Sequence, residues 1–169
     1  FIKDSPNECT VCNIMGAAYI GLGQYDKASE ALKKVIRLTP NYLNGLNNLG
    51  VVLKEQGKLD EAIQAFKKSI LLNPNDSVAY NNLANSFKDQ GKHDEALESY
   101  NKCIKLDPTY AEAHYNTGIV LKELGMFDRA IQSYNEALTL KPDFVNAYNN
   151  IGNIFKIQGK LKEALGSFK

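Results

Sequence analysis

The chain has 169 residues, of which 44% are hydrophobic and 23% are charged, a composition that can bury a core and argues against disorder throughout. Twenty basic and nineteen acidic side chains leave a net charge of +1, so net charge predicts neither nucleic acid nor an anionic membrane as a partner. No apolar run approaches the roughly 20 residues that span a bilayer. Three cysteines are too few for a disulfide-framed secreted module, and we expect a cytoplasmic (intracellular) protein.

Three residue types recur at one fixed step along the whole chain. Proline, glycine and alanine each return five times at intervals of 34 residues. The positions are Pro6, Pro40, Pro74, Pro108 and Pro142, then Gly23, Gly57, Gly91, Gly125 and Gly159, then Ala28, Ala62, Ala96, Ala130 and Ala164. The sequence is therefore a repeat array, and one repeat with its stacking decides the fold.

Each repeat predicts two short helices, as residues 43–76 illustrate. Apolar residues recur at helical spacing from Asn44 to Gln56, and Gly57 ends this first helix. A second helix opens at Asp60, where negative charge suits a helix N-terminus, and ends before Pro74. The core slots of the first helix are Leu46, Leu49, Gly50 and Leu53, and the apolar side of the second is Ala62, Ile63, Phe66, Ile70 and Leu71. Gly50 is expected to face Ala62 so that the two backbones approach closely.

The period divides the chain into a single array over residues 1–169. Residues 1–8 end a preceding repeat, full repeats follow at 9–42, 43–76, 77–110 and 111–144, and residues 145–169 form a truncated repeat. Because neither helix of a pair buries its apolar stripe alone, neighbouring pairs are expected to stack. The chain opens at Phe1 and stops in mid-pattern at Lys169, so we expect a fragment of a longer protein whose uncapped ends favour a homo-oligomer.

The repeat resembles the tetratricopeptide repeat. The matching pattern is Leu46-x2-Leu49-Gly50-x2-Leu53, followed by Ala62-x3-Phe66 and Pro74. The resemblance implies an all-α fold, a right-handed α-solenoid (superhelix) of helix-turn-helix repeats, and a protein–protein interaction scaffold that is not itself an enzyme. Three positions depart from the pattern: His114 in the slot of Tyr80, Thr117 in the slot of Leu49 and Leu83, and Lys162 in place of the Asp that opens the second helix elsewhere.

Asparagine is concentrated on one side of the first helices. At about 100° per residue, the slots of Asn44, Asn47, Asn48 and Val51 lie opposite the core slots. Twelve of the 18 asparagines fall in these slots, namely Asn13, Asn44, Asn47, Asn48, Asn81, Asn82, Asn85, Asn116, Asn146, Asn149, Asn150 and Asn153. Twelve asparagines forgo on the order of 6 kcal/mol of helix propensity relative to alanine. Each amide offers donors and an acceptor that match a peptide bond, so we expect a ladder that binds an extended main chain. The alternative is a tolerated polar residue inherited through duplication.

The tetratricopeptide resemblance places this face on the concave groove of the superhelix. The ladder looks like the asparagine-lined arm of O-linked N-acetylglucosamine transferases, in the slot of Asn48, Asn82, Asn116 and Asn150, with Ile14 breaking the row. Lys54, Lys88, Lys122 and Lys156 follow at the same period beside acidic residues, either as a solvated rim or as a row that favours acidic ligand segments. The predicted peptide-binding residues are Asn47, Asn48, Asn81, Asn82, Asn85, Asn116, Asn149, Asn150, Asn153, Lys54, Lys88 and Lys122.

The sequence does not indicate a carboxylate-binding, redox, metal or catalytic site. A carboxylate clamp of the chaperone-adaptor kind needs cations where this chain has Asn81, Asn85, Asn116, Asn146 and Asn150. Cys9 and Cys12 have redox or half-zinc spacing, but Cys12 falls in a core slot and no second pair follows, so we interpret all three cysteines as structural. No catalytic residues, cofactor or metal are predicted. The remaining alternatives are a substrate-recruiting arm of a larger transferase and a self-assembling scaffold.

Overall fold

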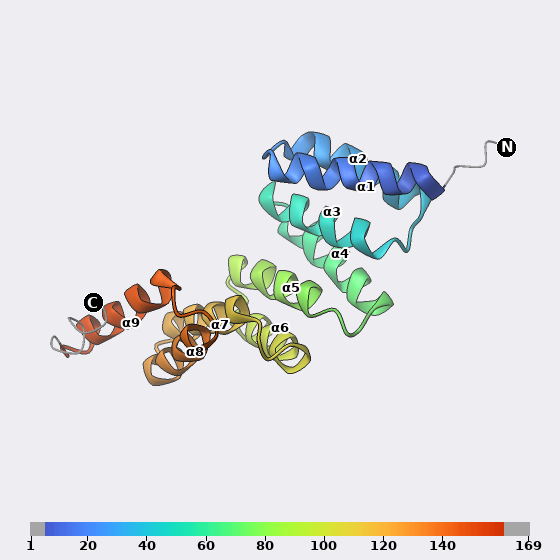
Figure 1. The fold of residues 1–169 in the computed structure, drawn as a ribbon. Coiled ribbons are helices and arrows are strands. Elements are labelled where there is room, and N and C mark those ends of the chain that lie inside the picture. The colour runs from blue at the N-terminus through green and yellow to red at the C-terminus, as the bar shows by residue number, and fades with distance from the viewer. Residues whose placement is uncertain (1–5, 161–169) are drawn as a thin grey trace. The chain divides into compact units, whose positions relative to one another are not determined.

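The computed structural model describes residues 6–160 and, within them, side chains from Glu8 onward. Predictions that fall on residues 1–5 and 161–169 lie outside this range, including Lys162, Ala164 and the second helix of the truncated repeat. Over the described residues the chain is all-α, with no strand (Figure 1). The helices are α1 (Pro6–Gly21), α2 (Tyr25–Leu38), α3 (Leu43–Glu55), α4 (Leu59–Leu72), α5 (Ser77–Asp89), α6 (His93–Leu106), α7 (Ala111–Glu123), α8 (Phe127–Leu140) and α9 (Val145–Ile157).

The chain divides into two compact units, residues 1–90 and residues 91–169. The first unit holds α1 to α5 and the second holds α6 to α9. Within each unit the first helices of neighbouring repeats contact one another, since α1 meets α3, α3 meets α5, and α7 meets α9. In the described part of the chain, the second helices α2 and α4 make no such contact, nor do α6 and α8. The first helices are therefore the closer-spaced layer of each unit.

A glycine in the left-handed region ends the first helix of each pair, as predicted from the period. Gly57 has φ of 74°, which costs other residues strain that glycine avoids. Its N–H donates to the Lys54 carbonyl at 2.9 Å, and the next N–H, of Lys58, donates to the Leu53 carbonyl at 2.8 Å. These bonds satisfy carbonyls that a helix end leaves open. The chain reverses direction at this turn, so α3 and α4 form an antiparallel pair.

The core slots are mostly as expected, with one clear correction. Leu46 is 2% exposed, Leu53 is 4% exposed and Phe66 is fully buried. Leu71, which we predicted on the apolar side of α4, is 81% exposed. It lies five residues after Phe66, about 140° around the helix from that side chain, so it points away from the packed side. Leu71 shows that an apolar side chain on α4 is not buried unless it also lies on the packed side of the helix.

In the small-residue slot, Gly50 and Gly118 face an aromatic ring and not the alanine that we predicted. A Cβ built on Gly50 would lie 2.5 Å from Cε1 of Phe66, and the three nearest atoms all belong to that ring rather than to Ala62. Gly118 stands in the same relation to Tyr134, at 2.6 Å. Close approach is thus the reason for glycine, but the neighbour is the large residue one turn further along the second helix.

Tyr134, in the second unit, is an exception to the rule that buried polar groups form hydrogen bonds. Its side chain is fully buried, and its hydroxyl has no hydrogen-bond partner among the described residues. Burial, reinforced by the nearby Tyr115 and Glu123, raises the pKa of Tyr134 well above its usual range. Tyr134 therefore stays protonated in the folded protein at any ordinary pH.

Candidate functional site

The slot of Asn48 holds an asparagine on two first helices of each unit. Asn48 lies on α3, Asn82 on α5, Asn116 on α7 and Asn150 on α9, and all four are half-buried. We call these four residues the asparagine column. Half-burial leaves part of each residue in contact with solvent.

Two members of the asparagine column form side-chain hydrogen bonds to a residue of the preceding repeat. The Asn48 amide nitrogen donates to Oδ1 of Asn13 at 3.1 Å, and the Asn150 amide nitrogen donates to the Tyr115 hydroxyl at 3.1 Å. The acceptors Asn13 and Tyr115 occupy the same slot of their repeats. Asn150 also accepts from Nζ of Lys122 at 2.9 Å. The pattern holds the amide planes in place from one repeat to the next.

The neighbouring slot of Asn47 and Asn81 is more deeply placed than we expected. Asn47 donates to Oδ2 of Asp76 at 3.4 Å, while Oδ1 of Asp76 accepts from the Ala79 N–H at 3.0 Å and so caps α5. Asn81 is only 6% exposed. Oδ1 of Asn47 and Oδ1 of Asn81 are buried without a hydrogen-bond partner among the described residues. Leaving a buried carbonyl unbonded costs roughly 1–3 kcal/mol each.

The remaining predicted binding residues differ in exposure. Asn149 and Asn153 are exposed on α9, whereas Asn85 is half-buried on α5. Asn85 and Asn116 both interact with other parts of the protein. The predicted asparagines therefore lie on first helices in both units and differ in how much of each residue is exposed to solvent.

Local carboxylates engage two of the three predicted lysines. Nζ of Lys54 lies 2.7 Å from Oε1 of Glu55, and Nζ of Lys88 lies 3.8 Å from Oδ1 of Asp89. Lys122 instead holds Asn150. The field of the lysine row is accordingly weakened at its first two members, as the adjacent acidic residues suggested.

The cysteines and histidines have structural surroundings. Cys9, Cys12 and Cys103 are free and buried, and Sγ of Cys9 lies 3.1 Å from the Thr39 hydroxyl. His93 opens α6, and its Nδ1 lies 3.7 Å from Oε2 of Glu123. Within residues 6–160 no group of three His, Cys, Asp or Glu side chains is arranged to hold a metal. Over the same residues, no helix combines the length and apolarity needed to cross a membrane.

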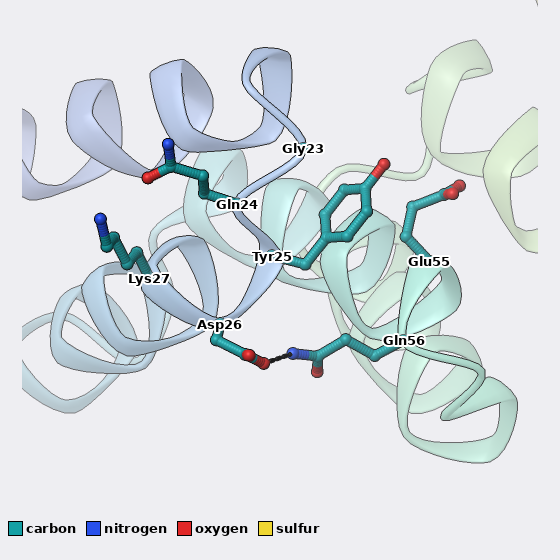
Figure 2. A pocket seen from close by; sticks show the side chains of 7 residues that line it. All are labelled: Gly23, Gln24, Tyr25, Asp26, Lys27, Glu55 and Gln56. Carbon is teal, nitrogen blue, oxygen red and sulfur yellow. Dashed lines mark hydrogen bonds between the residues drawn. The ribbon is translucent and has the colours of Figure 1, made fainter.

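A hollow of about 420 Å³ at the first glycine turn was not anticipated from the sequence (Figure 2). It lies between the start of α2 and the end of α3, and Gln56 crosses its edge to donate to Oδ1 of Asp26 at 2.9 Å. Gln90 makes the equivalent bond to Asp60 at 2.8 Å. The sequence does contain a pattern that could have indicated these bonds, because each glutamine follows its aspartate partner by 30 residues. These bonds tie one turn to the next, so we interpret the hollow as part of the framework.

Comparison with known proteins identifies the architecture. A family model described as TPR repeat matches residues 16–57, 84–125 and 120–159. Models described as Tetratricopeptide repeat match residues 44–76 and 65–98. No curated protein sequence matches the chain.

Solved structures of similar proteins share the fold over nearly the whole chain. A crystal structure of MamA is 31% identical, covers 90% of this chain and 90% of its own, and superposes with a TM-score of 0.82. MamA from Desulfovibrio magneticus RS-1 (20% identity; 95% and 91% coverage; TM-score 0.85) and a thermophilic TPR protein in Thermus thermophilus (22%; 94% and 87%; 0.78) share the fold alone. These likenesses confirm the predicted α-solenoid. The further likeness to the arm of O-linked N-acetylglucosamine transferases stays a prediction.

Proposed function

Because the chain belongs to the tetratricopeptide repeat family, we propose that it is a protein-interaction scaffold whose asparagine column binds the main chain of an extended peptide. The observation that carries the proposal is the side-chain hydrogen bonding of Asn48 and Asn150 to the preceding repeat, which holds their amides before any ligand arrives. Groups that are already ordered lose less conformational entropy on binding. The family match and the MamA neighbours support the scaffold class.

Asn48 and Asn150 retain hydrogen-bonding capacity for a ligand. An asparagine amide has two N–H donors and a carbonyl with two lone pairs. Asn48 uses one donor on Asn13, which leaves its second donor and its carbonyl. Asn150 uses one donor and one lone pair, which leaves one of each. A peptide bond presents one N–H and one C=O, so the remaining groups match main chain without reading side-chain identity.

The helix packing supports access along this side of each unit. The first helices contact one another while the second helices of the same unit do not, so each unit curves with its first helices inside. A face on the inside of a curve surrounds an extended ligand on more than one side. The proposed ligand lies along the first helices of a unit and meets successive column amides.

Peptides selected from a random-sequence display library against the whole chain provide the test. We expect binding to tolerate alanine substitution of most peptide side chains but to weaken at least tenfold on N-methylation of the peptide backbone, because N-methylation removes main-chain donors. Joint replacement of Asn82, Asn116 and Asn150 with alanine should weaken the same peptides to a similar degree. Fluorescence anisotropy measures each affinity.

An asparagine outside the column supplies the matched control. Asn135 is exposed on α8, so Asn135→Ala should leave peptide affinity unchanged. If the triple variant binds the selected peptides like the wild type while its melting temperature changes, the column is structural and the proposed function is wrong.

A further inference from the structure

A second hollow, of about 330 Å³, lies in the second unit where α6, α7 and α8 meet. Ile104 of α6 and Leu121 of α7 contribute apolar lining. His114 and Thr117 of α7, with Arg129 and Glu136 of α8, contribute polar and charged lining. The asparagine column member of this repeat, Asn116, is not part of the lining, so the hollow is a separate place on the molecule.

Two of its lining residues differ in chemistry from their counterparts in other repeats. The slot of His114 holds Cys12, Leu46, Tyr80 and Tyr148 elsewhere, and the slot of Thr117 holds Met15, Leu49, Leu83 and Ile151. His114 is fixed by a contact of 3.0 Å between its Nε2 and the Pro108 carbonyl. The Thr117 hydroxyl donates to the Ala113 carbonyl at 2.8 Å. Thr117 thus places a hydroxyl where the other repeats have a hydrocarbon or thioether side chain, and His114 places an imidazole where they have a thiol, a leucine or a phenol.

Two further lining residues carry the opposite charge to their counterparts in the two preceding repeats. The slot of Arg129 holds Glu95 and Glu61 in the two preceding repeats and Lys27 in the first, and the slot of Glu136 holds Lys34, Lys68 and Lys102. Arg129 is in the first turn of α8, where the helix dipole favours an acidic residue. The reversal therefore does not stabilise α8 itself. Departures from local rules that bring no local gain are expected where a surface has a function.

Neither reversed charge is neutralised within the described part of the chain. Arg129 and Glu136 are exposed and form no ion pair with residues 8–160. The polar contact of Arg129 runs from Nη1 to Sδ of Met126, at 3.5 Å. In the first repeat, by contrast, Lys34 in the slot of Glu136 pairs with Glu8 at 2.6 Å. The hollow thus carries one cation and one anion with charge to offer a ligand.

The spacing of the lining residues is that of a helix-receiving surface. Arg129 and Glu136 are seven residues apart on α8, about 10.5 Å at 1.5 Å per residue, with Gln132 and Ser133 between them on the same side. His114, Thr117 and Leu121 follow a similar stripe on α7. Two side chains seven residues apart on a ligand helix are also about 10.5 Å apart, so such a helix can place one side chain at Arg129 and the other at Glu136.

We propose that this hollow binds a helical segment of a protein partner that carries an acidic and a basic side chain seven residues apart, with an apolar side chain between them. The acidic group meets Arg129, the basic group meets Glu136, and the apolar side chain enters the hollow against Ile104 and Leu121. The proposal goes beyond peptide binding by the asparagine column and does not depend on it.

The probe is an alanine-based helical peptide of about 15 residues, long enough to hold marginal helicity. The mixed peptide carries one glutamate and one lysine seven positions apart with a leucine between them. Two companions replace the pair with two glutamates or with two lysines. We expect the whole wild-type chain to bind the mixed peptide about three- to tenfold more tightly than either companion at low ionic strength, with the preference shrinking in high salt.

Single charge reversals then redirect the preference. Arg129→Glu leaves two anions and should favour the two-lysine peptide, whereas Glu136→Lys leaves two cations and should favour the two-glutamate peptide. Both changes introduce the residue type of the equivalent slots in other repeats, so the fold is expected to persist. The companion peptides carry two like charges because a helix with one glutamate and one lysine can bind in either direction. Exchanging the two charges of the mixed peptide would therefore not reduce its binding.

Filling the hollow is the complementary test. Joint replacement His114→Tyr and Thr117→Leu introduces residue types present in the same slots of neighbouring repeats and should abolish binding of the mixed peptide. The triple alanine variant of the asparagine column should bind it normally, which separates this site from the proposed function. Amide chemical-shift changes on peptide addition should centre on residues 114–136.

Three outcomes overturn the proposal. They are no detectable binding of the mixed peptide by the wild type, equal affinity for all three peptides across the reversal variants, and unchanged binding after the hollow is filled. Self-association of the chain that is lost in Glu136→Lys would also overturn it, because a second copy would then be the occupant.

Discussion

Replacing Gly118 with alanine is the sharpest test of how the helix pairs pack. The added Cβ would lie 2.6 Å from Cε1 of Tyr134, 2.7 Å from Cδ1 and 3.0 Å from Cζ. Tyr134 is fully buried, and its ring centroid lies 5.6 Å from that of Tyr115. The ring has no open side toward which to move, so α7 and α8 must separate to admit the methyl group.

Two opposing contributions set the size of the effect. Overpacking a well-packed core costs about 1–3 kcal/mol. Exchanging glycine for alanine inside a helix returns about 1 kcal/mol of propensity. Because Tyr134 is fully enclosed, we expect the upper part of the range and a net loss of about 1–2 kcal/mol in the free energy of unfolding. Urea denaturation followed by far-UV circular dichroism measures this loss.

Gly21 provides the control, since nothing lies within 4 Å of a Cβ added there. Gly21→Ala should therefore be neutral or slightly stabilising. Combining Gly118→Ala with Tyr134→Ala should remove most of the penalty at position 118, because the obstructing ring is gone, and a double-mutant cycle reports that coupling. If Gly118→Ala is as harmless as Gly21→Ala, close approach to Tyr134 is not why glycine occupies this slot.

Further expectations concern buried and inter-repeat polar groups. Tyr134→Phe removes a hydroxyl that has no partner and should keep or raise stability by up to about 1 kcal/mol, whereas Phe66→Tyr buries a new hydroxyl in the equivalent slot and should lower stability by roughly 1–3 kcal/mol, both read by urea denaturation. The raised pKa of Tyr134 has a pH consequence, because the unfolded chain ionises this residue near pH 10 while the folded chain does not. Its contribution is fully present below about pH 10 and falls by up to about 1.4 kcal/mol per pH unit above it, a slope that Tyr134→Phe should remove from alkaline unfolding curves; an unchanged slope would contradict the assignment. Gln90→Leu breaks the exposed bond to Asp60 and should cost less than about 1 kcal/mol in the same assay, since Leu124 already occupies that slot one repeat later; a larger loss would make this bond a principal tie between repeats.

The 34-residue period of the sequence by itself determined the helices and most of the core. Gly57 predicted the end of α3, and the positive φ at that residue explains why glycine stands there. Leu46 and Phe66 were predicted as core and are almost entirely buried. These features are local, because backbone geometry alone decides which residues share a side of a helix.

Which neighbour a side chain meets was decided only by the tertiary structure. The contact of Gly50 with Phe66, the exposure of Leu71 and the burial of Asn81 all depend on how far one helix stands from the next. The bond from Asn48 to Asn13 joins residues 35 positions apart, one more than the period, so repetition alone does not reveal it.

The hollow beside His114 illustrates the same division. The departures at His114 and Thr117 were visible in the sequence, but Arg129 and Glu136 lie on another helix and did not stand out. Packing α7 against α8 brings these residues to the lining of one cavity. A repeat period specifies which slot a residue occupies, whereas the separation and rotation of packed helices specify which slots meet, and that information resides in the summed side-chain contacts of the folded chain.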